Sequence, residues 1–126
     1  MNFPQNLKYT KSHEWVEFIE ESKVRIGITD YAQKELGDIV FVNLPQPGDA
    51  ATTGDALCDV ESVKAVSDIF SPVTGTVSAV NEELLDAPER LNQTPYEAWL
   101  AEVKDVSGQE ELLSAQEYEA LVQKGE

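Results

Sequence analysis

The chain has 126 residues, the length of one domain with a single hydrophobic core. Its 24 acidic side chains outnumber the 9 basic ones and leave a formal net charge of −15. A charge this negative argues against direct binding to nucleic acid, which needs clustered Lys and Arg, and against docking on an anionic membrane. It suits simple solubility, and it also suits fast, salt-sensitive encounters with basic partner surfaces.

Cysteine content and the first residues bear on the cellular compartment. Cys58 is the only cysteine, so an internal disulfide is impossible, and its mostly apolar run 56-ALCDV-60 predicts a buried, unreactive thiol. No apolar run approaches membrane-spanning length, and the start MNFPQNLKYT lacks the apolar core of a secretory signal. We therefore expect a protein of the bacterial cytoplasm that does not associate with membranes. We also expect it to be a monomer, although no sequence feature tests this.

The first half of the chain is predicted to form strands. Apolar and polar residues alternate along 14–20 and again along 23–28, which indicates two half-buried strands joined as a hairpin. Asp30 in N-cap position and Gly37 beyond the last turn predict a short helix between them. The β-branched and aromatic run 38–44 predicts a further strand.

The second half continues with short strands and ends in a helix. Further strands are predicted at 55–62, 65–71, 75–81 and 98–104, with a helical turn and loop at 82–92. Ser114 and Glu117 match a capping box, so a last helix is expected over about 114–124. Many short strands, with helices only between them and at the tail, favour an all-β sandwich or barrel in a single domain over residues 1–126.

Lys64 stands out by its charge. Between Glu35 and Glu89 the chain carries eleven carboxylates, and Lys64 is the only cationic side chain. The strand-like arms on either side of it are nearly equal in length, which predicts a hairpin with Val63 and Lys64 at its tip.

The register of this hairpin can be predicted as well. Equal pairing about the tip places four side chains on one face, namely Cys58, Val60, Ser67 and Ile69. The same register sets Asp59 opposite Asp68, which costs free energy because like charges repel. This repulsion speaks against that particular register, though not against the hairpin.

Three roles are open to Lys64: a solvated lysine that balances acidic neighbours, a nucleophile or general base, and a site that another enzyme acylates. A turn made for solubility would normally use Gly, Asn or Asp rather than Val63 and Ala65. A nucleophilic lysine needs a lowered pKa, whereas Glu61 and Asp68 favour its charged form. The third role requires only that the turn present Lys64.

The sequence around Lys64 resembles a known family. The stretch ESVKAVSDIFSPVTGTVSAVNEEL is similar to the lipoyl-attachment region of glycine cleavage system H proteins. The resemblance extends to 9-YTKSHEWVE-17, 27-GITDYAQKELGDIVFVNLPQPG-48, 88-PERLNQTPY-96 and 112-LLSAQEY-118. Biotin carriers fit less well because they place methionines on both sides of the lysine, and Met1 is the only methionine here. Lipoyl domains of 2-oxo acid dehydrogenases usually have Asp where this chain has Val63.

The resemblance implies a mainly β, barrel-sandwich hybrid fold of the lipoyl- and biotinyl-carrier type, with short helices and a C-terminal helix. It implies lipoate bound covalently to Lys64 as N6-lipoyllysine, on an attachment turn that includes Glu61, Ser62, Val63 and Ala65. Recognition by the lipoylating enzymes is expected to depend on Glu61 and on the shape of this turn.

The resemblance also implies the partner enzymes and the function. The lipoyl arm would carry the aminomethyl group of glycine from the P protein (glycine decarboxylase) to the T protein (aminomethyltransferase). The L protein (dihydrolipoyl dehydrogenase) would then reoxidise the dithiol. On this interpretation the chain is a carrier and a substrate of each enzyme, and is not itself an enzyme.

In the family the loaded arm is thought to fold into a surface cleft, and the matching positions here are Ser12, Glu14 and Asp68. Carboxylates suit this task because a protonated aminomethyl nitrogen can donate charge-assisted hydrogen bonds to them. Without the resemblance, all three would be taken as ordinary turn and surface polar residues. His13 is the only histidine and no other ligand type clusters with it, so no metal site is expected.

Two departures from the family keep other functions open. In 95-PYEAW-99 only Glu97 and Ala98 separate the tyrosine from the tryptophan, where the family usually has three residues ending in Gly. Arg90 stands where an apolar residue is common. One alternative is a paralogue that relays lipoate or serves other enzymes, and another is a purely structural protein in which Lys64 stays unmodified.

Overall fold

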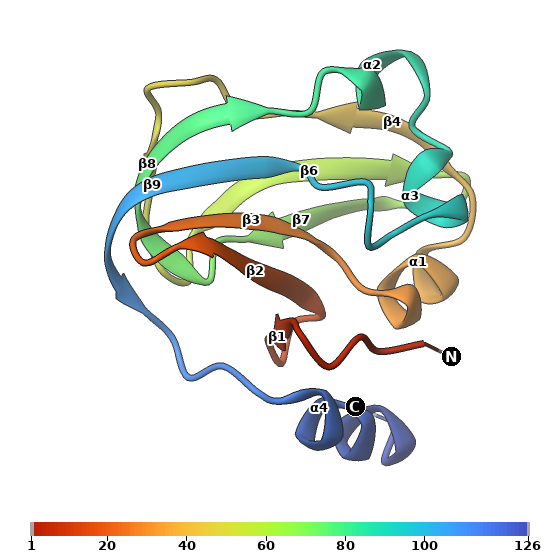
Figure 1. Ribbon diagram of the computed structural model, residues 1–126. Coiled ribbons are helices and arrows are strands. Elements are labelled where there is room, and N and C mark those ends of the chain that lie inside the picture. The colour runs from red at the N-terminus through yellow and green to blue at the C-terminus, as the bar shows by residue number, and fades with distance from the viewer. Residues whose placement is uncertain (1, 126) are drawn as a thin grey trace.

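The computed structural model describes residues 2–125, which form two antiparallel sheets that face each other (Figure 1). The larger sheet has six strands in the order β1-β2-β3-β9-β8-β5, and the smaller has three in the order β4-β6-β7. Each sheet has free edge strands, so neither closes into a barrel. The predicted mainly β sandwich with short helices and a C-terminal helix is confirmed.

The bounds of the elements are as follows. The larger sheet contains β1 (Lys8–Tyr9), β2 (Glu14–Glu20), β3 (Lys23–Ile28), β9 (Ala101–Gln109), β8 (Val73–Val80) and β5 (Ala50–Ala51). The smaller sheet contains β4 (Ile39–Asn43), β6 (Ala56–Ser62) and β7 (Val66–Phe70). The helices are α1 (Asp30–Leu36), α2 (Glu83–Asp86), α3 (Arg90–Gln93) and α4 (Ala115–Gln123).

A close contact between β2 and β3 fixes the centre of the larger sheet. Trp15 is almost fully buried and lies opposite Gly27 in the β2–β3 ladder. A Cβ atom on Gly27 would come within 2.5 Å of the Trp15 ring, so only glycine leaves room for the indole. The indole Nε1 donates a 3.0 Å hydrogen bond to the Pro95 carbonyl oxygen, which ties the β2 end to the loop before β9.

The predicted strand at 98–104 is wrong in its bounds, because β9 begins at Ala101 and runs to Gln109. Ala98 and Leu100 are buried, but they pack against the core under α1, α2 and α3 rather than extending β9. The apolar residues Ala98 and Leu100 are therefore buried without belonging to a strand. The polar C-terminal part of β9, up to Gln109, pairs with β8 instead.

The helix predicted after the first hairpin is confirmed as α1, but its N-cap is Thr29 and not Asp30. The Thr29 hydroxyl accepts a 3.2 Å hydrogen bond from the Ala32 backbone N–H. Asp30 instead occupies the first turn, where a carboxylate interacts favourably with the positive end of the helix dipole.

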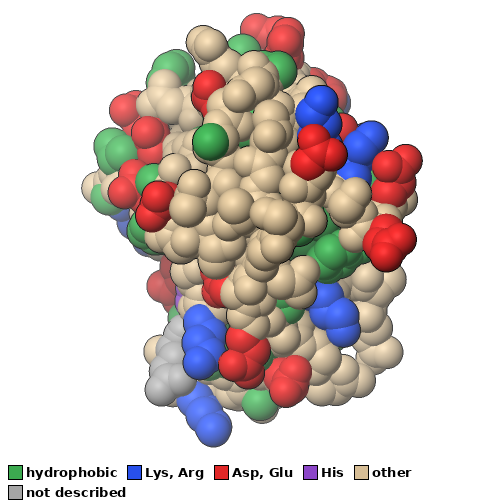
Figure 2. Space-filling model, turned by 90° about the vertical axis from the view of Figure 1, so that its left-hand side faces the viewer, with side chains coloured by type: hydrophobic (Ala, Val, Ile, Leu, Met, Phe, Trp, Pro, Cys, Tyr) green, Lys and Arg blue, Asp and Glu red, His purple; other side chains and the backbone are tan. Residues whose placement is uncertain are grey.

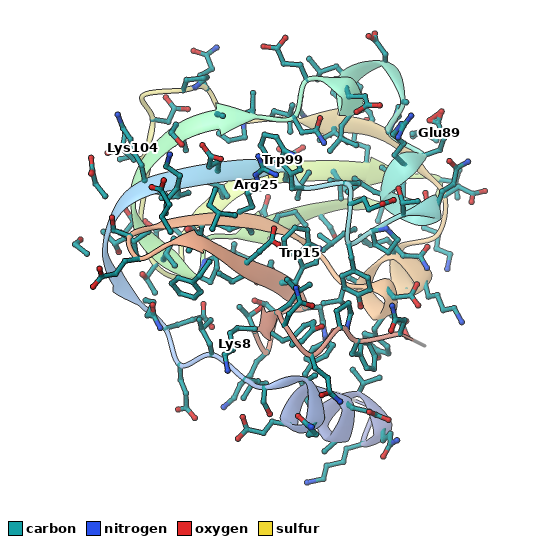
Figure 3. All side chains as sticks on the ribbon, in the orientation of Figure 1. Lys8, Trp15, Arg25, Glu89, Trp99 and Lys104 are labelled. Atoms are coloured by element: carbon teal, nitrogen blue, oxygen red, sulfur yellow. The ribbon has the colours of Figure 1, made fainter. Side chains whose placement is uncertain are left out.

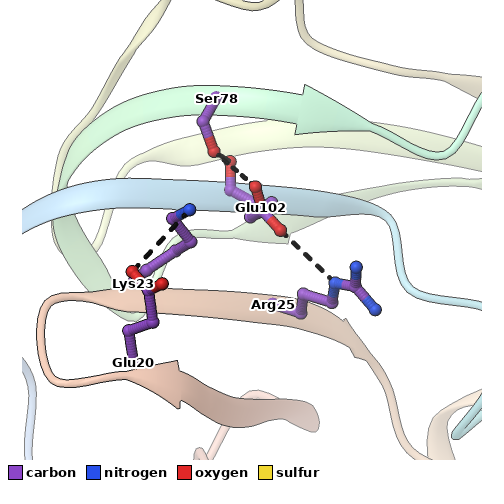
Figure 4. Close-up of polar contacts among 5 residues, drawn as sticks. All are labelled: Glu20, Lys23, Arg25, Ser78 and Glu102. Atoms are coloured by element: carbon purple, nitrogen blue, oxygen red, sulfur yellow. Dashed lines mark hydrogen bonds and ion pairs between the residues drawn. The ribbon is translucent and has the colours of Figure 1, made fainter.

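Polar contacts tie three strands together on the outer face of the larger sheet (Figure 4). The Glu102 carboxylate on β9 is 3.4 Å from the Arg25 Nε on β3 and accepts a 2.9 Å hydrogen bond from the Ser78 hydroxyl on β8. The Arg25 guanidinium also lies 4.7 Å from the centre of the Trp99 ring (Figure 3). Trp99, in the short PYEAW loop, is thus held over the sheet by a cation–π contact.

The capping box predicted for the last helix is present. Ser114 Oγ accepts from the Glu117 backbone N–H at 3.2 Å, and Glu117 Oε1 accepts from the Ser114 backbone N–H at 2.9 Å. From this start α4 packs beneath β1, away from the sandwich (Figure 1), with the Tyr118 ring stacked on Tyr9 at 4.8 Å. No helix within residues 2–125 has both the length and the apolar character needed to cross a membrane.

Candidate functional site

Lys64 lies in the turn between β6 and β7, at the same end of the molecule as α1 and α3 (Figure 1). The predicted hairpin register is present, with Cys58 opposite Ile69 and Val60 opposite Ser67. Asp59 does lie opposite Asp68, and the Asn43 side-chain amide on β4 donates a 2.7 Å hydrogen bond to Asp59. This hydrogen bond offsets part of the like-charge repulsion that spoke against the register.

The turn itself is ordered by Ser62. Its hydroxyl oxygen accepts hydrogen bonds from the backbone N–H groups of Lys64 at 3.1 Å and Ala65 at 3.2 Å. The Val63 backbone N–H donates to the Asp38 carbonyl oxygen at 3.0 Å, which fastens the turn to the start of β4. The Lys64 side chain is exposed on this ordered turn, as predicted.

The stem of Lys64 lies against the end of α1. A Cβ atom on Gly37 would be 3.3 Å from Lys64 Cε, so glycine leaves room here for the lysine stem. We call this space beside Gly37 the seat of the lysine. Gly37 has φ of 81° and ψ of −162°, a conformation that other residues rarely adopt. The sequence marked Gly37 only as a helix end, and its contact with Lys64 was not foreseen.

A groove lies next to this seat, between α1, the His13 turn and β7. Its volume is about 150 Å³, and the lining residues are Ser12, His13, Ile28, Ala32, Glu35, Leu36, Ser67, Asp68 and Ile69. Aliphatic side chains from α1, β3 and β7 give it an apolar wall, and Ser12 and Asp68 supply polar groups. We call this set of residues the arm groove. It joins three segments that are far apart in the sequence.

Two of the three predicted cleft residues, Ser12 and Asp68, line the arm groove, whereas Glu14 lies behind its wall. Glu14 is 1% exposed, and its Oε1 accepts 2.6 Å hydrogen bonds from the hydroxyls of Ser12 and Thr10. Burial raises the pKa of Glu14 to about 7, although hydrogen bonds from Ser12, Thr10 and the Phe70 backbone oppose the rise. Glu14 can therefore hold or release a proton near neutral pH, and Ser12 links it to the groove.

His13 is held by residues from distant parts of the chain. It has a positive φ of 73°, its Nδ1 is 2.8 Å from the Tyr118 hydroxyl oxygen, and its ring packs against Tyr31. The prediction that His13 orders the turn before Trp15 agrees with this geometry. Tyr118 follows His13 by 105 positions, and no pattern in the sequence connects them.

Other features of the structure do not contribute to this site. Cys58 is on the buried face of the hairpin strand β6, and burial raises the pKa of its thiol to about 12, which keeps it protonated and unreactive. Among residues 2–125, no group of three or more His, Cys, Asp or Glu side chains is arranged to hold a metal ion. Two larger hollows, of about 310 and 350 Å³, lie over the loop at 92–97 and beside β4, and neither is lined by Ser12, Glu14 or Asp68.

An ordered hairpin turn that exposes one lysine from a two-sheet sandwich defines a carrier domain of the lipoyl and biotinyl type. Comparison with known proteins gives the family. A family model described as glycine cleavage H-protein matches residues 7–125. The chain belongs to the glycine cleavage system H protein family.

Individual relatives agree with this assignment. The chain is 60% identical over 124 residues to a glycine cleavage system H protein of Lachnoclostridium phytofermentans, covering 98% of both chains. It is 53% identical to the protein of that name from Geobacillus kaustophilus, covering 99% of this chain and 100% of the other. A crystal structure of a glycine cleavage system H protein from Mycobacterium marinum superposes with a TM-score of 0.88 at 38% identity, covering 98% of this chain and 100% of that one.

Proposed function

We propose that this chain is the lipoyl carrier of the glycine cleavage system. In this role Lys64 bears lipoate and delivers the aminomethyl group of glycine from the P protein to the T protein, and then the dithiol to the L protein. The observation that carries the proposal is the exposed Lys64 on the Ser62-ordered turn of a hairpin whose second strand, β7, lines the arm groove with Ser67 and Asp68. The whole chain would act as one lipoyl-carrier domain.

The residues around Lys64 fit a lipoyl group. An amide to Lys64 Nζ removes the lysine charge and extends the stem by an aliphatic chain, which suits the seat at Gly37 and the apolar side of the arm groove. When bound, lipoate supplies a disulfide that can accept the aminomethyl group on one sulfur while the other sulfur becomes a thiol. The P protein would release the carboxyl group of glycine as carbon dioxide.

The chain's own residues would bind and shield the loaded end of the arm. Ser12 and Asp68 offer hydrogen-bond acceptors in the groove, and Glu14 adds a carboxylate behind Ser12. A cationic amine near Glu14 would favour its ionised form and so draw its pKa down. Apolar side chains of the groove would keep water from the loaded end, which can otherwise be hydrolysed.

Intact mass of the protein from cells with lipoate and a competent ligase tests this proposal. We expect one added lipoyl group in the wild type and in Lys104→Arg, and none in Lys64→Arg. Lys104 is a suitable control because it lies at the opposite end of the sandwich from the β6–β7 turn (Figure 3). A lipoyl group mapped to Lys104 or Lys34 would overturn the assignment.

Partner assays separate this proposal from the paralogue alternative. The lipoylated chain should support carbon dioxide release from glycine by the P protein, and Lys64→Arg should not. A lipoylated chain that the P protein ignores, but that passes lipoate to other proteins, would instead indicate a lipoate relay. The short PYEAW loop motivates this alternative, because it could alter docking without touching the attachment turn.

A further inference from the structure

We propose that Tyr118 of α4 is a positioning residue for the arm groove. Its hydroxyl group is hydrogen-bonded to His13, which lines the groove, and to Thr29, which caps the helix that supplies another part of the lining. This inference rests on the proposed function of the groove, and it gives the C-terminal helix a role in holding the loaded arm. Tyr118 does not line the groove, so it would act only through the residues that it positions.

Two short hydrogen bonds carry the proposal. The Tyr118 hydroxyl oxygen is 2.8 Å from His13 Nδ1 and 2.7 Å from Thr29 Oγ1. His13 lines the groove on one side. Thr29 caps the N-terminus of α1 by accepting from the Ala32 backbone N–H at 3.2 Å, and Ala32 lines the groove on the other side.

The proton positions form a consistent chain. Thr29 Oγ1 already accepts from the Ala32 N–H, so its own proton can be donated to the Tyr118 oxygen. In this arrangement the Tyr118 hydroxyl donates to His13 Nδ1, and the neutral His13 ring carries its proton on Nε2. The reverse arrangement, in which His13 Nδ1–H donates to Tyr118 and Tyr118 donates to Thr29, fits the same distances, and a measurement of the His13 tautomer distinguishes the two.

The hydrogen bonds of Tyr118 are separable from the packing of its ring. The ring is fully buried, stacks on Tyr9 at 4.8 Å and meets Phe3 edge-on at 5.1 Å. Replacing Tyr118 by Phe would preserve these contacts and remove only the hydroxyl. Tyr9 offers a matched control, since it is equally buried in the same cluster but its hydroxyl donates to the Pro4 carbonyl oxygen, away from the groove.

His13 connects the wall of the arm groove to the polar residues Ser12 and Glu14, which lie on either side of it in the sequence. Its left-handed backbone is held by hydrogen bonds from its N–H to the Thr10 carbonyl and from the Thr29 N–H to its carbonyl, both 3.2 Å. A residue with this φ keeps it only when its surroundings enforce it. A shift of His13 would move its sequence neighbours Ser12 and Glu14 together.

The experiment compares three variants with the wild type: Tyr118→Phe, Tyr9→Phe, and the double variant Glu14→Gln/Asp68→Asn, which removes the Asp68 carboxylate of the lining and the Glu14 carboxylate behind Ser12 and leaves Glu35 in place. Each is lipoylated, loaded with glycine and the P protein, and isolated, and the release of ammonia is followed without the T protein. Nitrogen-15 NMR of the unmodified variants reports the His13 tautomer and the groove amide shifts. Thermal melting confirms that each variant is folded.

We expect Tyr118→Phe to release ammonia about two to ten times faster than the wild type, because the hydroxyl that connects His13 to Thr29 is removed. Its His13 ring and groove resonances should shift, while Tyr9→Phe should match the wild type in both measurements. Wild-type release by folded Tyr118→Phe, with fast release by the double variant, would overturn the role of Tyr118 and leave the proposed function standing. Wild-type release by the double variant as well would overturn the groove as the arm's binding site, and the inference would fall with it.

Discussion

At the scale of single residues, Glu14 shows how burial can raise the pKa of a carboxyl group. In the sequence it is one acidic residue of an alternating strand, and the resemblance to the family assigns it to the cleft. The structure buries it with the Ser12 and Thr10 hydroxyls on one oxygen, and its pKa rises to about 7 because the charged form loses hydration. The sequence did not predict this burial, since Thr10 and Phe70 reach Glu14 only in the folded chain.

The raised pKa of Glu14 predicts a pH-dependent cost to stability. The folded state holds this proton up to about pH 7, whereas the unfolded state releases it near the ordinary value of 4.5. Between these values the folded state binds more protons than the unfolded state. The contribution of protonated Glu14 to the free energy of unfolding is therefore fully present below about pH 4.5 and is lost as the pH rises to 7. The loss is at most about 3 kcal/mol, from 1.36 kcal/mol per pH unit.

The Glu14→Gln variant tests this cost. Glutamine cannot ionise, so the free energy of unfolding of the variant should rise relative to the wild type between pH 4.5 and pH 8, as measured by urea denaturation. Glu117→Gln is the control, because its carboxylate is exposed and has a lowered pKa, which its hydrogen bonds to Ser114 cause. A constant difference between Glu14→Gln and the wild type across this pH range would show that Glu14 ionises normally.

A second residue-scale prediction concerns the loaded arm. If Glu14 and Asp68 hold the cationic end, the Glu14→Gln/Asp68→Asn variant should release ammonia and formaldehyde at least several-fold faster than the wild type at neutral pH, because charge-assisted hydrogen bonds are lost. Lipoylation of Lys64 should be nearly unchanged by Glu14→Gln alone, since Glu14 is buried away from the turn. If the wild type and the double variant release ammonia at equal rates, Glu14 and Asp68 do not bind the loaded arm.

At the scale of elements, local patterns predicted the hairpins and the cap of α4 better than the cap of α1 and the short strands. Alternation located β2 and β3 within their observed bounds, and equal arms about Lys64 predicted the β6–β7 register. The Asp59–Asp68 pair argued against that register only because the partner of Asp59, Asn43, comes from another strand. The strands β1 and β5 have two residues each, too short for alternation to show.

The end of α1 yields a prediction about glycine. Gly37→Ala should lower the free energy of unfolding by about 1–3 kcal/mol, because its φ of 81° with ψ of −162° is strained for other residues. It should also slow lipoylation of Lys64, since the added methyl would press on the lysine stem at 3.3 Å. Urea denaturation and the initial rate of lipoylation by a ligase give the two values.

Gly48→Ala separates strain from contact. Gly48 also has a positive φ, of 98°, but a Cβ atom there would meet nothing within 4 Å. This variant should lose stability and be lipoylated at the wild-type rate. Equal lipoylation rates for both variants would mean that the seat at Gly37 does not matter to the lysine.

At the scale of the whole molecule, the arm groove is assembled from segments that local patterns cannot bring together. Ser12, the α1 residues Ala32 and Leu36, and Asp68 meet only because the β6–β7 hairpin packs across α1 and the His13 turn. The family resemblance identified Ser12 and Asp68, but it did not identify the apolar wall or Tyr118. These depend on tertiary packing, which leaves no periodic mark on the chain.

The charges are also distributed over the whole molecule. Figure 2 shows the left-hand side of Figure 1, where acidic side chains are spread among Lys and Arg side chains rather than gathered in one patch. The opposite end carries the β6–β7 turn, and from Glu35 to Glu89 Lys64 is the only cationic side chain. Lipoylation would remove that charge and leave Lys34 on α1 and Arg90 on α3 as cationic side chains on the helices at this end.

This distribution predicts that partner enzymes approach the β6–β7 end under electrostatic attraction. Raising sodium chloride from 50 mM to 500 mM should lower kcat/KM for a lipoylating ligase or the P protein by about tenfold, with kcat nearly unchanged, because salt screens the encounter and not the chemistry. The double variant Asp38→Asn/Glu61→Gln, next to the turn, should reproduce part of this loss at low salt. Glu20→Gln/Glu21→Gln removes the same charge from the β2–β3 turn at the other end (Figure 1) and should behave as the wild type. If both double variants lower kcat/KM equally, attraction acts through net charge alone and the β6–β7 end has no special part in steering.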